Sequence, residues 1–209
     1  MPSYYEIPVI IPSYEPDEKL ITLLAALQDA GIRHVIVVDD GSGEQYASFF
    51  TRAAAFTNCE VLRHAVNLGK GRALKTAFNH CLLTYGGTSG ERSTGKTGSA
   101  MPGCVTADSD GQHTPADILA CMRKLWENPE SLILGCRDFD GPKVPARSSF
   151  GNKCTRQVFR YLLGLSVSDT QTGLRAVPTF FMEKLMEVKG ERFEYETNML
   201  IETKNLTIP

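Results

Sequence analysis

The chain has 209 residues, of which 42% are hydrophobic, so it can bury a sizeable core without outside help. Lysine and arginine number 22 and aspartate and glutamate 24, which gives a formal net charge of −2. A chain so close to neutral has no overall basic field, and we expect no nucleic-acid partner. The composition also excludes a disordered chain and a collagen-like repeat.

Six cysteines are dispersed along the chain, without a C-x-x-C pair or a zinc-like grouping with histidine. Such cysteines suit a reducing compartment and buried apolar positions. No apolar run approaches the roughly 18 residues that a membrane-spanning helix needs, and the first residues do not resemble a signal peptide. We therefore expect a cytoplasmic chain that does not itself cross a membrane.

Apolar runs and amphipathic stretches alternate from the start of the chain. Short apolar or β-branched runs predict strands at residues 7–11, 35–38, 60–64, 104–107 and 131–136. Apolar residues at helical spacing predict helices at residues 16–30, 44–56, 69–85, 115–127, 179–188 and 193–206. This alternation indicates an α/β fold with a mostly parallel sheet. Residues 206–209 resemble the opening of another strand, so we expect a chain cut from a longer protein.

Charged side chains follow three predicted strands, at the edge of the sheet where open α/β folds bind ligands. They are Asp39 with Asp40, Asp108 with Asp110, and Arg137. Asp108 and Asp110 flank one residue at a turn, so both carboxylates can reach one hard cation such as Mg²⁺ or Mn²⁺ and leave positions for substrate phosphates. The alternative for each acidic pair is a simple turn after a strand.

Residues 141–168 contain no aspartate or glutamate, whereas five lysines and arginines fall there among apolar residues. Lys153, Arg156 and Arg160 are spaced to share one helix face. Two interpretations stay open. The segment is either a core helix with a solvated basic face or a helix that rests on an anionic membrane surface.

Residues 90–97 match the phosphate-binding pattern G-x-x-x-x-G-K-[ST]. Such a loop works when a buried strand precedes it and a helix leaves from its Lys-Thr. Here a predicted helix precedes the pattern, and Gly98, Pro102 and Gly103 oppose a helix after it. We interpret residues 86–103 as a flexible surface insertion and keep a P-loop nucleotide-binding protein as an alternative function.

Five motifs stand in order along the chain: IIPSY at 10–14, VVDDGS at 37–42, NLGKG at 67–71, DSDGQH at 108–113 and DTQTGLR at 169–175. The first four resemble family-2 glycosyltransferases in order and spacing, and the fifth resembles the polyprenyl-phosphate branch, which includes dolichol-phosphate mannosyltransferase. The similarity covers nearly the whole chain outside residues 86–103. It implies a GT-A-type, Rossmann-like α/β/α sandwich, one domain over residues 1–209.

The resemblance divides this domain into a nucleotide-sugar-binding half, residues 1–112, and an acceptor-binding half, residues 113–209. It implies that the base and ribose of a UDP- or GDP-linked sugar lie in a cradle formed by Pro12, Tyr14, Asp39 and Asp40. It further implies that Asp108, Asp110 and Gln112 hold the metal and the diphosphate, with Lys70 as an added counter-charge. Glu15 and Pro16 depart from the Asn-Glu of many relatives, so which acid helps to hold the nucleotide stays open.

The activity implied by the resemblance is inverting transfer of a sugar to a polyprenyl phosphate at the cytoplasmic membrane face. The metal would neutralise the leaving diphosphate. An acceptor phosphate is already anionic at neutral pH, so it needs positive charge to hold it rather than a base. Arg137 and Arg147 are the candidates for that charge.

Other roles are left open. A sugar or protein hydroxyl acceptor would require a general base, either Asp169 or one of Glu194 and Glu196. Asp169 could also orient a sugar hydroxyl, hold Arg175 or cap a turn. Glu194 and Glu196 share a predicted helix, and we expect at least one of them to face solvent. His113 could extend the metal site, but we interpret it as a polar turn residue.

Overall fold

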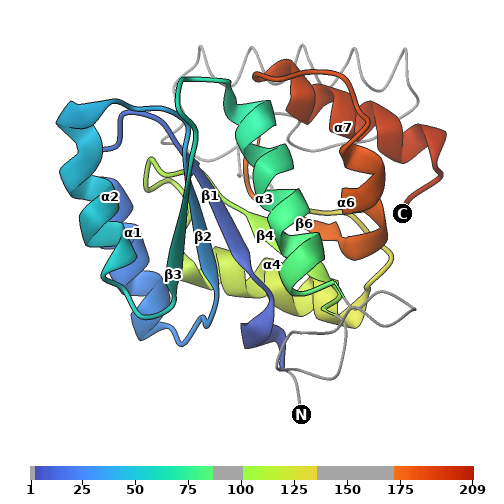
Figure 1. Cartoon of the computed structure of the whole chain (residues 1–209). Coiled ribbons are helices and arrows are strands. Elements are labelled where there is room, and N and C mark those ends of the chain that lie inside the picture. The colour runs from blue at the N-terminus through green and yellow to red at the C-terminus, as the bar shows by residue number, and fades with distance from the viewer. Residues whose placement is uncertain (1–2, 87–100, 136–171) are drawn as a thin grey trace, which may run out of the picture.

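The computed structural model describes residues 3–86, 101–135 and 172–209. Their centre is a six-stranded sheet in the order β3-β2-β1-β4-β6-β5 (Figure 1). The strands are β1 (Val9–Ser13), β2 (Val35–Asp39), β3 (Cys59–Arg63), β4 (Gly103–Thr106), β5 (Ile133–Leu134) and β6 (Arg175–Pro178). The pairs β1–β2, β1–β4 and β2–β3 are parallel, and β6 is antiparallel to both of its neighbours. The predicted mostly parallel sheet is confirmed.

Helices cover both faces of the sheet, so the α/β/α sandwich is also confirmed (Figure 1). On one face lie α1 (Glu18–Asp29), α2 (Ala47–Ala54) and α4 (Pro115–Glu127). On the other lie α3 (Lys70–Thr84), α6 (Thr179–Leu185) and α7 (Glu194–Asn205). Short 3₁₀ turns at Tyr4–Glu6 and Glu44–Tyr46 precede β1 and α2.

The central strands are apolar on both faces because helices pack on both. In β2, Val35 and Val37 belong to the core with α1 and α4, whereas Ile36 and Val38 belong to the core with α3 and α7. Such strands have no polar face, and therefore they appear as continuous apolar runs in the sequence.

Helix α4 begins where the sequence predicts. The Thr114 hydroxyl accepts from the backbone N–H of Asp117, and the Asp117 carboxylate accepts from the backbone N–H of Thr114, which forms a capping box with Pro115 at the first helical position. This cap ends the DSDGQH loop, so the turn that carries Asp108 and Asp110 has a fixed boundary.

Strand β6 was not predicted, and it lies between β4 and β5. The prediction of a strand opening at residues 206–209 is wrong. Those residues close the last turn of α7, where the Ile208 N–H donates to the Thr203 carbonyl at 2.9 Å, and the Pro209 carbonyl accepts from Leu132. The predicted helix at residues 44–56 is divided between a 3₁₀ turn and α2.

Several predictions lie outside the described residues. They concern Arg137, Arg147, Asp169, the basic segment 141–168, the P-loop-like pattern 90–97 and most of the proposed insertion 86–103. Of the four cysteines in the described part of the chain, Cys81, Cys104 and Cys121 are buried, as predicted, whereas Cys59 is only partly buried. No helix in that part is both long enough and apolar enough to cross a membrane.

Candidate active site

A pocket of about 570 Å³ lies at the carboxyl ends of β1, β2 and β4. Its lining residues come from those strand ends, from the loop before α3 and from the start of α7. They are Pro12, Ser13, Tyr14, Asp40, Asn67, Gly69, Lys70, Asp108, Ser109, Asp110, Arg192, Phe193 and Glu196. Motifs that are far apart in the sequence therefore meet at the edge of the sheet where a ligand is expected.

Six of the residues predicted for the site line this pocket: Pro12, Tyr14, Asp40, Lys70, Asp108 and Asp110. Asp39, Gln112 and Arg175 do not line it. Asn67, Ser109, Arg192 and Phe193 were not predicted. No pattern in the sequence distinguishes them from ordinary loop residues, although Asn67 and Ser109 lie inside the recognised motifs. Phe193 is 76% exposed, so it contributes a large apolar side chain to the pocket mouth.

Lys70 lies between two carboxylates of the pocket. Its Nζ is 2.7 Å from Asp108 Oδ1 and 2.9 Å from Glu196 Oε2. Burial lowers the pKa of Lys70, but the charges of Glu196 and Asp108 outweigh this effect and leave the pKa above its ordinary value. Lys70 is therefore a fixed positive charge at neutral pH. Of the two glutamates predicted as candidates on α7, Glu196 lines the pocket. Glu194 is exposed, and its carboxylate accepts from the backbone N–H of Glu191.

Asp108 is held from both of its oxygens. Lys70 contacts Oδ1, and His113 Nε2 lies 3.5 Å from Oδ2. Burial raises the pKa of Asp108, but the nearby His113 side chain and the charge of Lys70 hold it well below its ordinary value. His113 lies in the turn before α4, as interpreted, but its side chain is buried beside this carboxylate.

Glycines allow the start of α3 to approach the start of α7. A Cβ at Gly71 would lie 2.6 Å from the Tyr195 Cβ, and a Cβ at Gly69 would overlap the carbonyl oxygen of Glu191. Gly69 also has φ +99°, a conformation that glycine adopts without strain. The two glycines of the NLGKG motif thus bring Lys70 within reach of Glu196.

The Asp39–Asp40 pair holds loops around the pocket. Asp40 lies at the pocket wall, and its carboxylate accepts the N–H groups of Leu68 at 3.0 Å and Gly69 at 2.8 Å. His64 Nδ1 lies 2.8 Å from the same carboxylate. Asp39 accepts from the Ser42 N–H and from Arg63. Asp40 therefore fixes the loop that carries Lys70.

Arg175 is buried in β6, with 1% of its surface exposed. Its Nε donates to the Thr172 carbonyl at 3.0 Å, and its Nη1 donates to the Glu196 carbonyl at 2.7 Å. The structure thus places Arg175 behind the pocket, where it anchors the first turn of α7.

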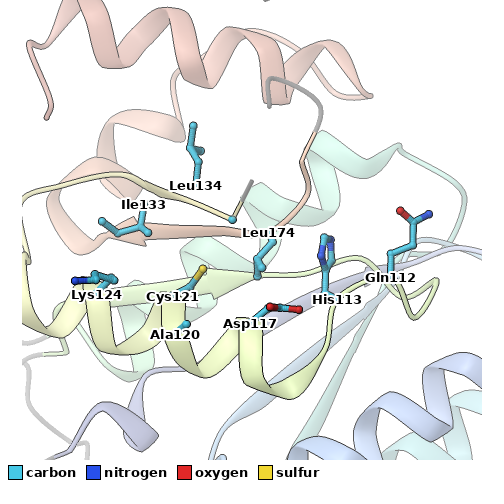
Figure 2. A pocket seen from close by; sticks show the side chains of 10 residues that line it. Gln112, His113, Asp117, Ala120, Cys121, Lys124, Ile133, Leu134 and Leu174 are labelled. Atoms are coloured by element: carbon cyan, nitrogen blue, oxygen red, sulfur yellow. The ribbon is translucent and has the colours of Figure 1, made fainter. Parts of the chain in front are cut away.

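Gln112 contacts Asp110 from outside the main pocket. Its backbone N–H and Nε2 donate to the Asp110 carboxylate at 3.0 and 2.6 Å. Gln112 and His113 instead line a second pocket of about 490 Å³, which α4 forms together with Leu174 and β5 (Figure 2). Gln112 is therefore placed to orient the Asp110 carboxylate from outside the main pocket.

The donor set of the main pocket suits a hard divalent cation. Among the described residues there is no cluster of three or more histidine, cysteine, aspartate and glutamate side chains that could enclose a metal ion. Mg²⁺ and Mn²⁺ do not need such a cluster, because one or two carboxylates together with substrate phosphates and water complete their coordination. Asp108 and Asp110 supply two carboxylates. The Lys70 ammonium contacts Asp108 Oδ1, so this carboxylate already has a positively charged partner.

Solved structures with a similar fold are glycosyltransferases of the GT-A type. The structure of residues 1–349 of S. aureus TarS in complex with UDP-GlcNAc matches with a TM-score of 0.54 and 15% identity, covering 93% of this chain and 53% of that chain. This chain thus spans about half the length of that solved fragment, and the likeness shows the fold.

Sequence comparison finds similarity to one glycosyltransferase family over part of the chain. Residues 9–86 match the model of glycosyl transferase family 2. The UDP-N-acetylglucosamine–dolichyl-phosphate N-acetylglucosaminyltransferase of Methanococcus voltae is 28% identical, covering 94% of this chain and 79% of that protein. The polyprenol monophosphomannose synthase of Mycolicibacterium smegmatis is 25% identical, covering 90% and 69%. Residues 9–86 thus match glycosyl transferase family 2, and the sequence relatives and structural neighbours of the chain are glycosyltransferases.

Proposed function

We propose that this chain is a family 2 glycosyltransferase that moves a sugar from a nucleotide diphosphate sugar to a polyprenyl phosphate, with inversion of the anomeric carbon. The observation that carries the proposal is the meeting of Lys70, Asp108 and Asp110 in one pocket at the carboxyl edge of the sheet. The two curated relatives act, by their names, on dolichyl phosphate and in polyprenol monophosphomannose synthesis, which supports this acceptor class.

Asp108 and Asp110 are the residues that would hold Mg²⁺ or Mn²⁺. When bound, the cation supplies positive charge to the departing diphosphate. Lys70 adds a second positive charge to the same part of the pocket, and its ammonium can donate to the diphosphate oxygens. His113 and Gln112 keep the two carboxylates in place.

Pro12 and Tyr14 form the wall on which the nucleoside would rest, and Asp40 supports that end of the pocket from the backbone side. Residues 1–112 supply most of this donor site. Arg192, Phe193 and Glu196 line the same pocket, so the second half, residues 113–209, also contributes to donor binding besides the proposed acceptor site.

The acceptor site is proposed to use Arg137 and Arg147, whose guanidinium groups can grip phosphate oxygens in pairs. Asp169 would orient a sugar hydroxyl near them. The basic segment 141–168 would rest on the anionic inner face of the cell membrane, where each lysine or arginine contributes about 1 kcal/mol of attraction. This arrangement gives a peripheral enzyme access to a lipid substrate.

A sugar or protein hydroxyl acceptor is the second candidate. The observation that favours it is the Glu196 carboxylate in the pocket, which could accept a proton from a hydroxyl. An acceptor screen separates the two. Polyprenyl phosphate accepts the sugar in our proposal, whereas free polyprenol and sugar acceptors do not.

Calorimetric titration with UDP-glucose, UDP-N-acetylglucosamine and GDP-mannose, with and without Mn²⁺, tests the donor site. We expect one donor to bind only with Mn²⁺, and Asp110→Ala to lose that binding. Asp29→Ala, which removes an exposed carboxylate at the end of α1, is the matched control and should bind as the wild type does. Equal affinity without metal and in Asp110→Ala would contradict the proposal. Deletion of residues 87–100, which removes the pattern at 90–97 and keeps the buried Met101 and the whole of β4, should leave donor binding intact, whereas a P-loop function would lose it.

A further inference from the structure

The Lys70 ammonium contacts two carboxylates, which come from segments that lie far apart in the sequence. Asp108 follows β4 and Glu196 lies in the first turn of α7, and both are within 2.9 Å of the Lys70 ammonium. The side chain of Glu196 is 12% exposed and that of Asp108 is 30% exposed. Glu196 is therefore the more enclosed partner, and Asp108 is the one more open to a ligand.

The position of Glu196 is fixed by its neighbours. Its carbonyl accepts the buried Arg175 Nη1 at 2.7 Å. The adjacent Tyr195 is fully buried, and its hydroxyl donates to the Leu185 carbonyl at 2.8 Å. The first turn of α7 is thus tied to β6 and to the end of α6. A carboxylate on this turn therefore has a fixed position and can hold a long, flexible lysine side chain in one place.

We propose that Glu196 is a positioning residue for Lys70 in donor binding. This inference rests on the proposed function. A divalent cation on Asp108 would repel the neighbouring ammonium and compete for the same carboxylate. Glu196 then remains as the partner that keeps Lys70 in the pocket, directed at the diphosphate. Without Glu196, the ammonium would lose its second partner and the ordered position that goes with it.

A positioning role and a purely electrostatic role of Glu196 predict opposite effects on nucleotide affinity. If Glu196 acted only through its negative charge, it would repel the diphosphate, and neutralising it would strengthen nucleotide binding. If it positions Lys70, neutralising it weakens binding. The same substitution made in a protein that lacks the Lys70 ammonium has nothing left to position, so there it should leave the affinity unchanged or raise it.

The test is a double-mutant cycle on the affinity for UDP and GDP, measured by calorimetry with Mn²⁺ present. We expect Glu196→Gln to weaken binding of the preferred nucleotide about tenfold, the scale of one hydrogen bond to a charged group. Lys70→Met should weaken it at least as much. Lys70→Met with Glu196→Gln should bind no more weakly than Lys70→Met alone. Glu196→Asp, which keeps the charge but shortens the side chain, should give a partial loss.

Glu202→Gln is the matched control, because it removes the same charge from α7 at a position outside the main pocket, and it should bind as the wild type does. Thermal unfolding of each variant verifies that it folds. Tighter binding by Glu196→Gln, or an equal loss with and without Lys70, would overturn the inference while donor binding by the wild type still supports the proposed function. If the wild type binds neither nucleotide and Asp110→Ala is no different, the proposed function fails and the inference fails with it.

Discussion

The carboxylate of Asp108 lies directly against the backbone of Gly173, so that a Cβ at position 173 would overlap both of its oxygens. This contact joins the DSDGQH loop to the DTQTGLR motif. The backbone on either side of Gly173 is fixed, because the Gly173 carbonyl accepts from the Thr106 hydroxyl at 2.8 Å and the Leu174 N–H donates to the Thr172 hydroxyl. A glycine is therefore required here for close approach rather than for a special backbone angle.

Gly173→Ala should displace Asp108 and weaken Mn²⁺-dependent nucleotide binding by at least tenfold, with a loss of stability of about 1–3 kcal/mol from overpacking. Calorimetry and denaturant unfolding measure the two effects. Gly135→Ala is the control, since the atoms nearest to its added methyl belong to the Leu174 side chain and not to Asp108. It should cost stability without a comparable loss of nucleotide affinity. Equal effects of both substitutions on affinity would argue against a specific role of the Asp108–Gly173 contact.

The Lys70–Asp108 contact predicts a particular dependence of stability on pH. The pKa of Asp108 is held below its ordinary value, so its contribution to stability is present above about pH 4 and is lost as the pH falls further. The pKa of Lys70 is raised, so its contribution is present below about pH 10 and is lost above it. The difference in melting temperature between the wild type and Lys70→Met, measured without metal, should be largest between these limits. A difference that does not change between pH 3 and pH 7 would contradict this.

Glu15 adopts φ +49°, a left-handed conformation that asparagine tolerates better than glutamate. Glu15→Asn should therefore stabilise the protein by about 0.5 kcal/mol, measured by denaturant unfolding. The backbone N–H of residue 15 would keep its hydrogen bond to the Ser42 hydroxyl. Thr207 has φ +53° and is β-branched, so Thr207→Asn should give an equal or larger gain. A loss of stability in both variants would show that the left-handed backbone is not strained.

The Asp40 carboxylate has more partners than that of Asp39, because it accepts from two backbone N–H groups and contacts His64. Asp40→Asn should cost about 2 kcal/mol, since an amide cannot accept at both positions and a buried donor loses its partner. Asp39→Asn should cost less, because one of its partners, Arg63, is largely exposed. Chemical denaturation of both variants tests this order. The reverse order would contradict the assignment of Asp40 as the anchor of the loop before α3.

The features that were predicted correctly depend on short-range patterns. The runs at β1 and β2 indicate buried strands because helices cover both faces, and the cap at Thr114 fixes the start of α4 within one turn. The acidic residues of the pocket were predictable because the carboxyl ends of parallel strands meet at one edge.

The features that were missed depend on contacts between distant segments. Strand β6 has only four residues and begins with a charged arginine, so its pairing with β4 is set by the tertiary structure. The contact between Lys70 and Glu196 exists because two glycines let α3 approach α7. Neither Gln112 nor His113 lines the main pocket, because the turn after Asp110 directs His113 toward Asp108 and places Gln112 against Asp110 from outside.

A crystal structure with Mn²⁺ and the bound donor nucleotide tests the central claim most directly. The account predicts an anomalous manganese peak between Asp108 and Asp110, with the diphosphate beside Lys70 and the nucleoside against Tyr14. Manganese and phosphates found away from these side chains, for example in the second pocket beside α4, would contradict it.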